Sequence, residues 1–367
     1  MKQTLLFTSL ICLILPLNAQ KSNYRLLIGT YTNTGKSEGI YTYEIDLEKF
    51  VFTQKSVAKE LENPSYLALT SDKKYIYAVS ESDIASKTGA FAFNESIGKL
   101  SFINNSDTHS SGPCFVSTTK HHVVTANYGG GSISVFGRND NGSLTDVLQL
   151  IQHVGGSIDP NRQREPHVHQ VKFTPDGKYL LVNDLGTDKV TVYSYNANSK
   201  TNILTPFDSI EVKAGSGPRH LTFSKDGKRV YLLQEMDGTI TVLKLDKGKL
   251  TKLQETTVVK KTDIETGAAD IHLSPDERFL YATNRGTAND ISCFSVAKDG
   301  TLTFVQQYST GGVGPRNFSL TPDGKYILVG NQQTDNITIF KRNTKTGLLT
   351  NTGKSIKVGA PVCLLFY

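Results

Sequence analysis

Residues 217–235, GPRHLTFSKDGKRVYLLQE, decide the fold. Two short apolar runs flank the turn residues Asp226 and Gly227, and this pattern is typical of two strands that pair across a tight turn. The stretch therefore predicts a β-hairpin. Because both strands run back from the turn, we expect Arg219 and Glu235 to lie together at the opposite end of the hairpin.

The same hairpin pattern recurs along the chain. Further copies stand at residues 63–81, 112–128, 165–185, 267–285 and 314–332. Each copy is followed by two more strand-like runs, for example residues 291–296 and 302–308. The unit is thus four strands with a period of about 50 residues, which is the pattern of a propeller blade.

The two ends of the chain carry an incomplete unit each. Residues 359–367 stop after one strand, whereas residues 24–31, 39–46 and 50–54 form three strand-like runs without a first strand. We expect the two ends to complete each other as a seventh blade, which leaves no free sheet edge. The predicted fold is all-β: a single seven-bladed β-propeller of four-stranded blades over residues 20–367, closed by pairing of the N- and C-terminal strands.

The first residues, MKQTLLFTSLICLILPLNAQ, have the order of a secretory signal, with a charge at Lys2, an apolar run and a small-residue end. We expect residues 1–19 to be a signal peptide cleaved after Ala19, so that the protein is exported to the periplasm or secreted. The alternative is an uncleaved anchor, although the apolar run is short for a bilayer and no membrane span is expected in the mature protein. Three cysteines then remain, which indicates no disulfide framework.

The net charge of +6 is spread through lysine-rich turns, so no nucleic-acid partner is expected. We expect a monomer. The sequence contains no Gly-x-Ser-x-Gly, Cys-x-x-Cys or glycine-rich phosphate loop, which excludes serine-hydrolase and nucleotide-binding sites of those kinds.

Two sets of aligned positions are expected at one end of the channel, because the first strand of each blade starts there and the second strand ends there. The strand-one ring is Ser65, Cys114, His169, Arg219, Ala269, Arg316 and Val362. The strand-two ring is Tyr31, Glu81, Tyr128, Leu185, Glu235, Arg285 and Gln332. Arginines and histidines gather in four consecutive blades, so this end of the channel, the mouth, suits a small polar anion.

Four of these residues fit the hydrolysis of an ester or lactone. Glu235 beside cations would stay ionised and take a proton from water, and His169 would orient that water or protonate the leaving alkoxide. Arg285 or Arg219 would offset charge on the carbonyl oxygen. The alternatives are a rim ion pair between Glu235 and Arg219, and a His169 that only hydrogen-bonds a neighbouring blade.

Other side chains are candidates for substrate contact. They are His167, His220, Arg316, Asn127, Asp184, Asn284 and Asn331. Arg316 fits packing equally well. The unpatterned loop at residues 155–164 is either a lid or a variable surface loop.

Glu165, His167 and His169 alternate and resemble metal ligands, but Pro166 interrupts the run and no further ligand is evident. We therefore expect no metal and no cofactor.

With these residues in view, the chain resembles the seven-bladed propeller lactonase family, which includes bacterial propeller-type 6-phosphogluconolactonase and the fungal carboxymuconate-cyclising enzyme. The resemblance is most specific in residues 165–193, with their Pro-His-x-His and Asp-Leu-Gly-Thr-Asp elements, and in residues 217–235. It implies that His169, Arg219, Glu235 and Arg285 match the His, Arg, Glu, Arg set of the family, and that no metal is required.

The resemblance implies hydrolysis of a sugar-acid lactone, as in 6-phosphogluconolactonase, with a small anionic lactone as substrate. Because 6-phosphogluconolactone is a cytosolic metabolite, an exported enzyme is expected to meet another lactone. Two alternatives stay open: a propeller that binds a small anionic ligand without catalysis, and a carboxymuconate cyclase-like enzyme, since fold alone does not determine function.

Overall fold

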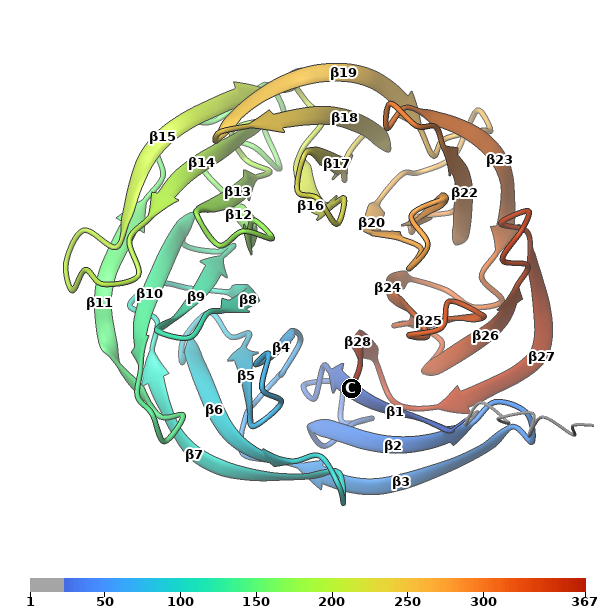
Figure 1. Cartoon of the computed structure of the whole chain (residues 1–367), viewed down its shortest axis with the longest axis horizontal. Helices are drawn as coiled ribbons and strands as arrows, with labels where there is room; N and C mark the ends of the chain where they lie inside the picture. The colour runs from blue at the N-terminus through green and yellow to red at the C-terminus, as the bar shows by residue number, and fades with distance from the viewer. Residues whose placement is uncertain (1–22) are drawn as a thin grey trace, which may run out of the picture.

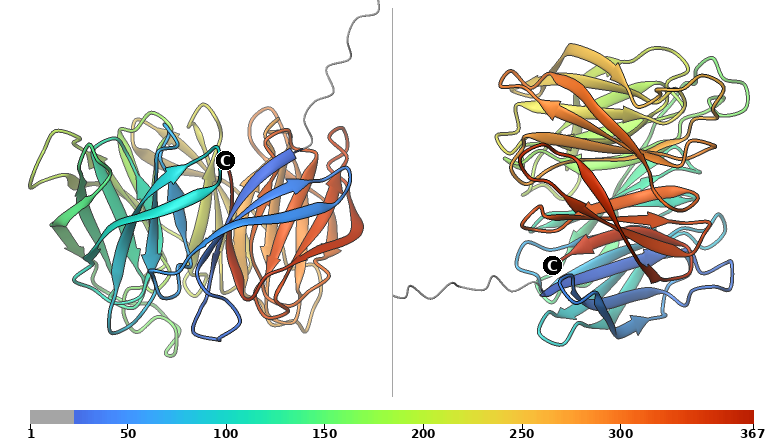
Figure 2. Two further views of the ribbon diagram at one scale, coloured as in Figure 1. Left: turned by 90° about the horizontal axis from the view of Figure 1, so that it is seen from below. Right: turned by 90° about the vertical axis from the view of Figure 1, so that its right-hand side faces the viewer.

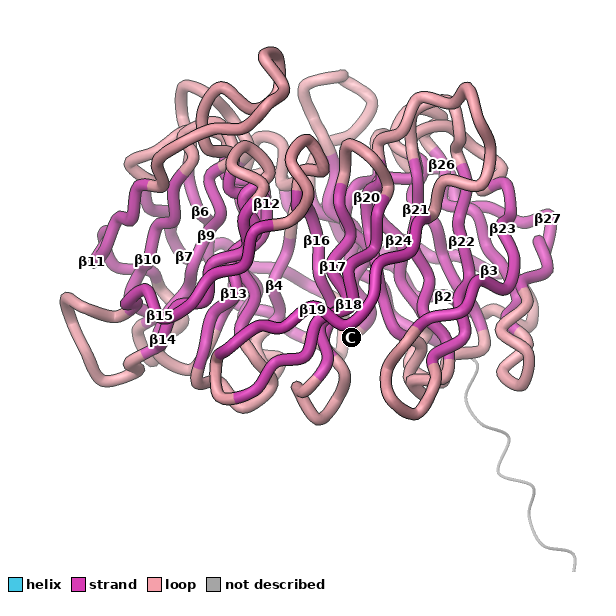
Figure 3. Tube along the Cα trace, turned by 90° about the horizontal axis from the view of Figure 1, so that it is seen from above, coloured by secondary structure: helices cyan, strands magenta, loops and turns pink. Residues whose placement is uncertain are grey.

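The computed structural model describes residues 23–367, and the predicted signal peptide, residues 1–19, lies outside the described residues. Seven sheets of four antiparallel strands stand around a central channel (Figure 1), which confirms the predicted seven-bladed propeller. Side views show the blades packed side by side in a disc (Figure 2), with strands that run between its two faces (Figure 3).

We number the blades from the first one completed along the chain. Blade one holds β4 (Leu67–Leu69), β5 (Tyr75–Ser80), β6 (Lys87–Asn94) and β7 (Lys99–Asp107). Blade two holds β8 (Pro113–Thr118), β9 (His122–Asn127), β10 (Ser132–Arg138) and β11 (Leu144–Gln152). Blade three holds β12 (Val168–Phe173), β13 (Tyr179–Asp184), β14 (Lys189–Tyr195) and β15 (Leu204–Glu211).

The remaining blades follow the same order from the channel outward. Blade four holds β16 (Pro218–Phe223), β17 (Arg229–Gln234), β18 (Thr239–Asp246) and β19 (Lys249–Thr257). Blade five holds β20 (Ala268–Leu273), β21 (Phe279–Asn284), β22 (Asp290–Val296) and β23 (Leu302–Ser309). Blade six holds β24 (Pro315–Leu320), β25 (Tyr326–Asn331), β26 (Asn336–Arg342) and β27 (Leu349–Lys357). Blade seven joins β28 (Pro361–Phe366) to β1 (Asn23–Thr30), β2 (Ile40–Asp46) and β3 (Val51–Ala58).

The seventh blade closes the ring as the sequence predicts. The C-terminal strand β28 pairs antiparallel with β1, so that Leu26 faces Phe366 and Gly29 faces Cys363. The backbone N–H of Leu364 also donates to Oδ1 of Asn317 in blade six at 2.7 Å. The first and last described strands are thereby held in one sheet, which removes the exposed edge that a partial blade would leave.

The turn of the β16–β17 hairpin shows why the repeat folds locally as it does. Oδ1 of Asp226 accepts hydrogen bonds from the hydroxyl of Ser224 at 2.6 Å and from the N–H of Lys228 at 3.0 Å. Gly227 follows with a φ of 69°, a left-handed conformation that glycine adopts without strain. Asp72, Asp176, Asp276 and Asp323 make the same side-chain bonds in blades one, three, five and six.

The core lies between the blades. Leu181 and Val192 of blade three pack with Leu221 and Leu232 of blade four in one buried apolar cluster. Outer strands such as β11 alternate partly buried and exposed side chains, because only one of their faces meets a neighbouring blade.

A β-bulge stands at the strand-one ring, and the hairpin pattern did not predict it. In blade four, Pro218 pairs with Gln234 and His220 pairs with Leu233, so that Arg219 is the extra residue. Equivalent register shifts occur in blades two, three, five, six and seven. A bulge re-aims side chains, and here Arg219 and His220, although consecutive, both line the channel cavity.

Candidate active site

The two rings meet at the mouth in every blade. The backbone N–H of each strand-two ring residue donates to the carbonyl that lies two positions before the strand-one ring residue of the same blade, as Glu235 does to Gly217 at 2.7 Å. The same bond recurs from Tyr31, Glu81, Tyr128, Leu185, Arg285 and Gln332. The repeat alignment therefore placed the two rings correctly.

Glu235 is the centre of an arginine cluster. Its Oε2 accepts from Nε of Arg219 at 2.8 Å and contacts Nη2 of Arg285 at 2.9 Å. Its Oε1 accepts from Nη2 of Arg162 at 2.7 Å. Glu235 is 7% exposed and Arg219 is 1% exposed, so this is a desolvated cluster rather than a surface ion pair.

The cluster determines the charge state of Glu235. Burial alone would raise the pKa of this carboxyl, but the charges of Arg285, Arg219 and Arg162 hold the pKa well below its ordinary value. Burial lowers the pKa of Arg285 to about 10, which still leaves it charged at neutral pH. The cluster around Glu235 thus holds one carboxylate and three guanidinium groups, a net positive charge.

His169 lies beside this cluster and is 5% exposed. Its ring stands edge-on to the rings of Tyr128 and His220, with centroids 5.5 Å and 5.2 Å away. Burial, together with the charge of Arg219, holds the pKa of His169 well below its ordinary value. The imidazole is therefore neutral at neutral pH and carries one N–H and one lone pair; its Nδ1 lies 4.0 Å from Sγ of Cys114.

The two other candidate histidines lie at different depths. His167 is partly exposed, stacks on Tyr128 with ring centroids 4.5 Å apart, and donates from Nδ1 to the carbonyl of Tyr128 at 2.9 Å. His220 is buried below His169, where Nδ1 lies 2.8 Å from Oδ1 of Asp270. Only His220 of these two lines the cavity beneath the mouth.

The opposite side of the mouth holds a second carboxylate, Glu81, to which the sequence analysis gave no role. Oε2 of Glu81 accepts from the hydroxyl of Tyr31 at 2.9 Å and from the hydroxyl of Ser65. The guanidinium of Arg316 lies 5.4 Å from the centroid of the Tyr31 ring and lines the cavity with Ser65. Among residues 23–367, Arg316 makes no side-chain hydrogen bond or ion pair. Its guanidinium is the one at the mouth that is not bound to Glu235.

Four predicted substrate contacts lie elsewhere. Asn127, Asp184, Asn284 and Asn331 have no exposed surface. Nδ2 of Asn127 donates to Ser132 and Ser134, and Oδ1 of Asp184 accepts from the N–H of His167. Oδ1 of Asn284 accepts from the N–H of Gly267, and Nδ2 of Asn331 donates to Thr338. These side chains point into their blades and do not reach the mouth.

The loop at residues 155–164 supplies a site residue that the sequence analysis missed. Nη2 of Arg162 donates to the hydroxyl of Tyr128 at 3.1 Å as well as to Glu235. The unusual length of the loop was the only signal in the sequence, and it singled out no residue. The contact shows that the loop reaches over the mouth.

The described residues hold no group of three or more His, Cys, Asp and Glu side chains that would bind a metal ion. Cys114, Cys293 and Cys363 are buried free thiols. No helix among residues 23–367 has the length and apolar character to cross a membrane.

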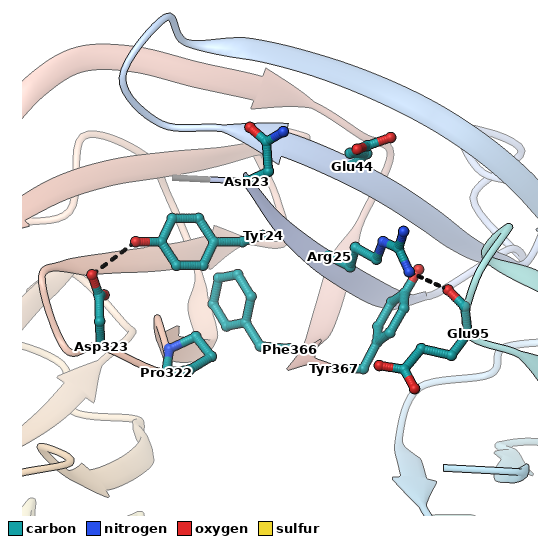
Figure 4. Close-up of a pocket in the computed structure, with 9 residues that line it drawn as sticks. All are labelled: Asn23, Tyr24, Arg25, Glu44, Glu95, Pro322, Asp323, Phe366 and Tyr367. Atoms are coloured by element: carbon teal, nitrogen blue, oxygen red, sulfur yellow. Dashed lines mark hydrogen bonds between the residues drawn. The ribbon is translucent and has the colours of Figure 1, made fainter. Parts of the chain in front are cut away.

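A larger cavity lies at the other face, beside the start of β1 and the end of β28 (Figure 4). There the hydroxyl of Tyr24 donates to Asp323 at 2.9 Å, and Arg25 donates to the carbonyl of Glu95 at 2.5 Å. This cavity contains none of the strand-one or strand-two ring residues, so the candidate site remains the mouth.

Comparisons with known proteins agree on the family. The sequence model of the family described as "Lactonase, 7-bladed beta-propeller" matches residues 25–366. The 6-phosphogluconolactonase of Bacillus subtilis is 34% identical over 346 residues, which cover 92% of this chain and 97% of that protein. The 6-phosphogluconolactonase of Formosa agariphila is 32% identical over 349 residues, which cover 93% of this chain and 99% of that protein.

Solved structures give the same result. A candidate 6-phosphogluconolactonase from Bacteroides fragilis superimposes with a TM-score of 0.91 at 42% identity, covering 95% of this chain and 99% of that one. The periplasmic gluconolactonase of Pseudomonas aeruginosa superimposes with a TM-score of 0.89 at 35% identity, covering 94% and 99%. The chain belongs to the seven-bladed β-propeller lactonase family of enzymes.

Proposed function

We propose that this protein hydrolyses a sugar-acid lactone, in the manner of a 6-phosphogluconolactonase, at the arginine-rich mouth of its channel. One observation carries the proposal. Glu235 is buried and ionised, three arginines occupy three of its roughly four acceptor positions, and Oε1 keeps one position free. A water that donates to this position would lie beside the neutral ring of His169.

Each residue of the site then has its own role in the hydrolysis of the lactone. As the water oxygen bonds to the lactone carbonyl carbon, Glu235 accepts the proton that this water loses. Arg285 and Arg219 stabilise the negative charge that grows on the carbonyl oxygen. When the ring C–O bond breaks, the alkoxide receives a proton through His169, and the proton on Glu235 replaces it. Glu235 is a modest base because its pKa is low, but a lactone is an activated ester.

The anionic group of the substrate would bind on the other side of the mouth. Arg219, Arg285 and Arg162 already pair with Glu235, so an anion bound to them would compete with that carboxylate. Arg316 has no such partner among residues 23–367 and stands over Tyr31. We therefore assign to Arg316 the contact with a carboxylate or phosphate of the substrate.

Export is part of the proposal. The signal-like order of residues 1–19 supports it, and so does the similarity to a periplasmic gluconolactonase. An exported enzyme would act on a lactone outside the cytosol.

A direct assay tests the function. The purified mature protein is mixed with glucono-δ-lactone and, separately, with 6-phosphogluconolactone, and acid release is followed against the spontaneous rate. Hydrolysis of either lactone well above that rate supports the proposal. Binding of the lactones without acceleration would instead support the non-catalytic binding module.

A further inference from the structure

One residue further into the channel than the strand-one ring lies a second set of aligned positions, the deeper ring. It consists of Tyr66, Phe115, Gln170, His220, Asp270, Asn317 and Cys363. The polar members come from four consecutive blades, three to six, whose first strands β12, β16, β20 and β24 are neighbours around the channel (Figure 1). The deeper ring is therefore apolar on one side and polar directly beneath the arginine cluster.

The polar members share a structural task. Oε1 of Gln170 accepts from the N–H of Leu221 in the next blade at 2.7 Å, and Oδ1 of Asn317 accepts from the N–H of Leu364 at 2.7 Å. Oδ2 of Asp270 faces the N–H of Phe318 in the same way, at 3.4 Å. An amide serves this bridge between blades at two of the three positions, so the bridge does not require the negative charge of Asp270.

The charge of Asp270 has other partners. Oδ1 lies 2.8 Å from Nδ1 of His220, and Oδ2 lies 2.9 Å from Nε2 of His272 and accepts from Nδ2 of Asn317 at 2.5 Å. Asp270 is 2% exposed. A buried carboxylate is costly unless it is paired, and well-packed apolar side chains often replace such groups without loss of stability. The arrangement therefore points to a use other than stability.

Asp270 determines which nitrogen of His220 carries the proton. Burial alone would raise the pKa of Asp270, but His272 and His220 hold it well below its ordinary value, so the carboxylate is ionised and can only accept. Nδ1 of His220 must then be the donor. Burial, with the charge of Arg219, lowers the pKa of His220 to about 3, so Nε2 is unprotonated and is an acceptor at neutral pH.

Nε2 of His220 has no hydrogen-bond partner among residues 23–367. It keeps some accessible surface, because it is absent from the set of fully buried polar atoms that lack a partner. His220 lines the small cavity beneath the mouth together with Ser65, His169, Arg219 and Arg316. The two guanidinium groups can only donate hydrogen bonds. His220 adds an acceptor to this side of the cavity.

We propose that Asp270 is a positioning residue of the lactone site: it holds the Nδ1 proton of His220, so that Nε2 of His220 accepts the O–H of a water or a lactone hydroxyl in the cavity beneath the mouth. This inference rests on the proposed function. A water and a lactone hydroxyl both offer an O–H donor. They differ in which lactones are hydrolysed more slowly when the acceptor is removed.

The test compares three variants on two lactones. Asp270→Asn keeps the bridge between blades, as Gln170 and Asn317 do in their own blades, but its amide no longer enforces the tautomer. His220→Gln removes the imidazole. His272→Gln is the matched control, because it removes the other histidine on Asp270 and leaves His220 in place. The lactones are glucono-δ-lactone, which carries hydroxyls, and δ-valerolactone, which carries none.

We expect Asp270→Asn and His220→Gln each to lower kcat/KM for glucono-δ-lactone about 10- to 100-fold, the effect of one charge-assisted hydrogen bond. The double variant should fall no further than the more damaged single variant, because the two residues act as a unit. If a ligand hydroxyl is the donor, δ-valerolactone hydrolysis stays unchanged; if a water is the donor, it falls by the same factor. His272→Gln should keep wild-type rates on both lactones.

A spectroscopic reading separates positioning from folding. In protein with ¹⁵N-labelled histidine, the Nε2 signal of His220, assigned by its loss in His220→Gln, should be that of an unprotonated nitrogen, and Asp270→Asn should shift it. Should Asp270→Asn fail to fold, the kcat/KM of His220→Gln and the wild-type ¹⁵N spectrum still test the inference.

The inference is overturned if wild-type His220 carries its proton on Nε2, if Asp270→Asn or His220→Gln keeps full activity on glucono-δ-lactone, or if His272→Gln loses as much activity on that lactone as they do. A wild type that opens no lactone overturns the proposed function itself.

Discussion

Arg162 and Glu235 are 73 positions apart in the chain, yet Nη2 of Arg162 lies 2.7 Å from Oε1 of Glu235. The contact ties the loop between blades two and three to the carboxylate of blade four. Arg162 is the most exposed partner of Glu235, with 43% of its side chain accessible. The mouth is thus covered from one side by this loop, through the most exposed of the three arginines on Glu235.

Replacing Arg162 by Gln should therefore affect the site more than the fold. We expect kcat/KM for a lactone to fall about tenfold, because one charge-assisted hydrogen bond on Glu235 is lost, and the melting temperature to change little. Arg164→Gln, a change of the same kind in the same exposed loop, is the control and should retain activity. Equal activity of the two variants would show that the loop contact has no catalytic consequence.

Arg316 should control anion binding. Phosphate or citrate is expected to raise the melting temperature of the wild type, by mass action on the folded state. Arg316→Gln should lose most of this rise, whereas Arg278→Gln, in a turn at the opposite face, should keep it. Differential scanning fluorimetry against anion concentration measures both. A rise that survives in Arg316→Gln would place the anion elsewhere.

Closure of the ring should be essential for a soluble fold. Deletion of residues 361–367 removes β28, exposes β1 as an edge and uncovers buried side chains of blades one and six. We expect aggregation or a large fall in melting temperature, measured by light scattering and circular dichroism. A truncated protein that stays soluble, monomeric and equally stable would argue against the role of this pairing.

Acid should destabilise the protein through its buried histidines. The pKa of His220 falls from the ordinary 6.5 to about 3 on folding, so between these values the unfolded chain binds a proton that the folded chain does not. Stability should therefore decrease as the pH falls below about 6.5, by at most about 1.4 kcal/mol per pH unit for each such histidine. Urea unfolding at pH 7, 6 and 5 measures the slope.

His220→Gln should make that slope shallower. Parallel slopes for the wild type and His220→Gln would mean that His220 is protonated in the folded protein.

Much of the fold and half of the site could be predicted, because the sequence repeat shows both the strands of each blade and the positions that are equivalent between blades. The Asp-Gly turn and the alternating strands recur with one period, and counting from the turn gives equivalent positions in every blade. That count predicts that His169, Arg219, Glu235 and Arg285 lie at one end of the channel, and the structure places them there.

The remaining residues were missed for identifiable reasons. Asn127 and Asn284 stand one place before a strand-two ring residue, and the two-residue period of a strand turns such neighbours into the blade. The bulge at Arg219 leaves no mark in the alternation; His220 was a predicted substrate contact, but the sequence did not show the bulge through which it lines the cavity beside Arg219. Arg162 lies in a loop that has no copy in the other blades, so no alignment could place it.

Glu235→Gln tests the central claim most directly. The substitution keeps the size of the side chain and removes the charge that gathers three arginines, so we expect a lower melting temperature but a folded propeller by circular dichroism. Turnover of a lactone that the wild type opens should fall about 10² to 10⁴-fold. Glu211→Gln, on the exposed outer strand of blade three, should be unaffected. Near wild-type turnover by Glu235→Gln would contradict the account and leave the mouth without its proton acceptor.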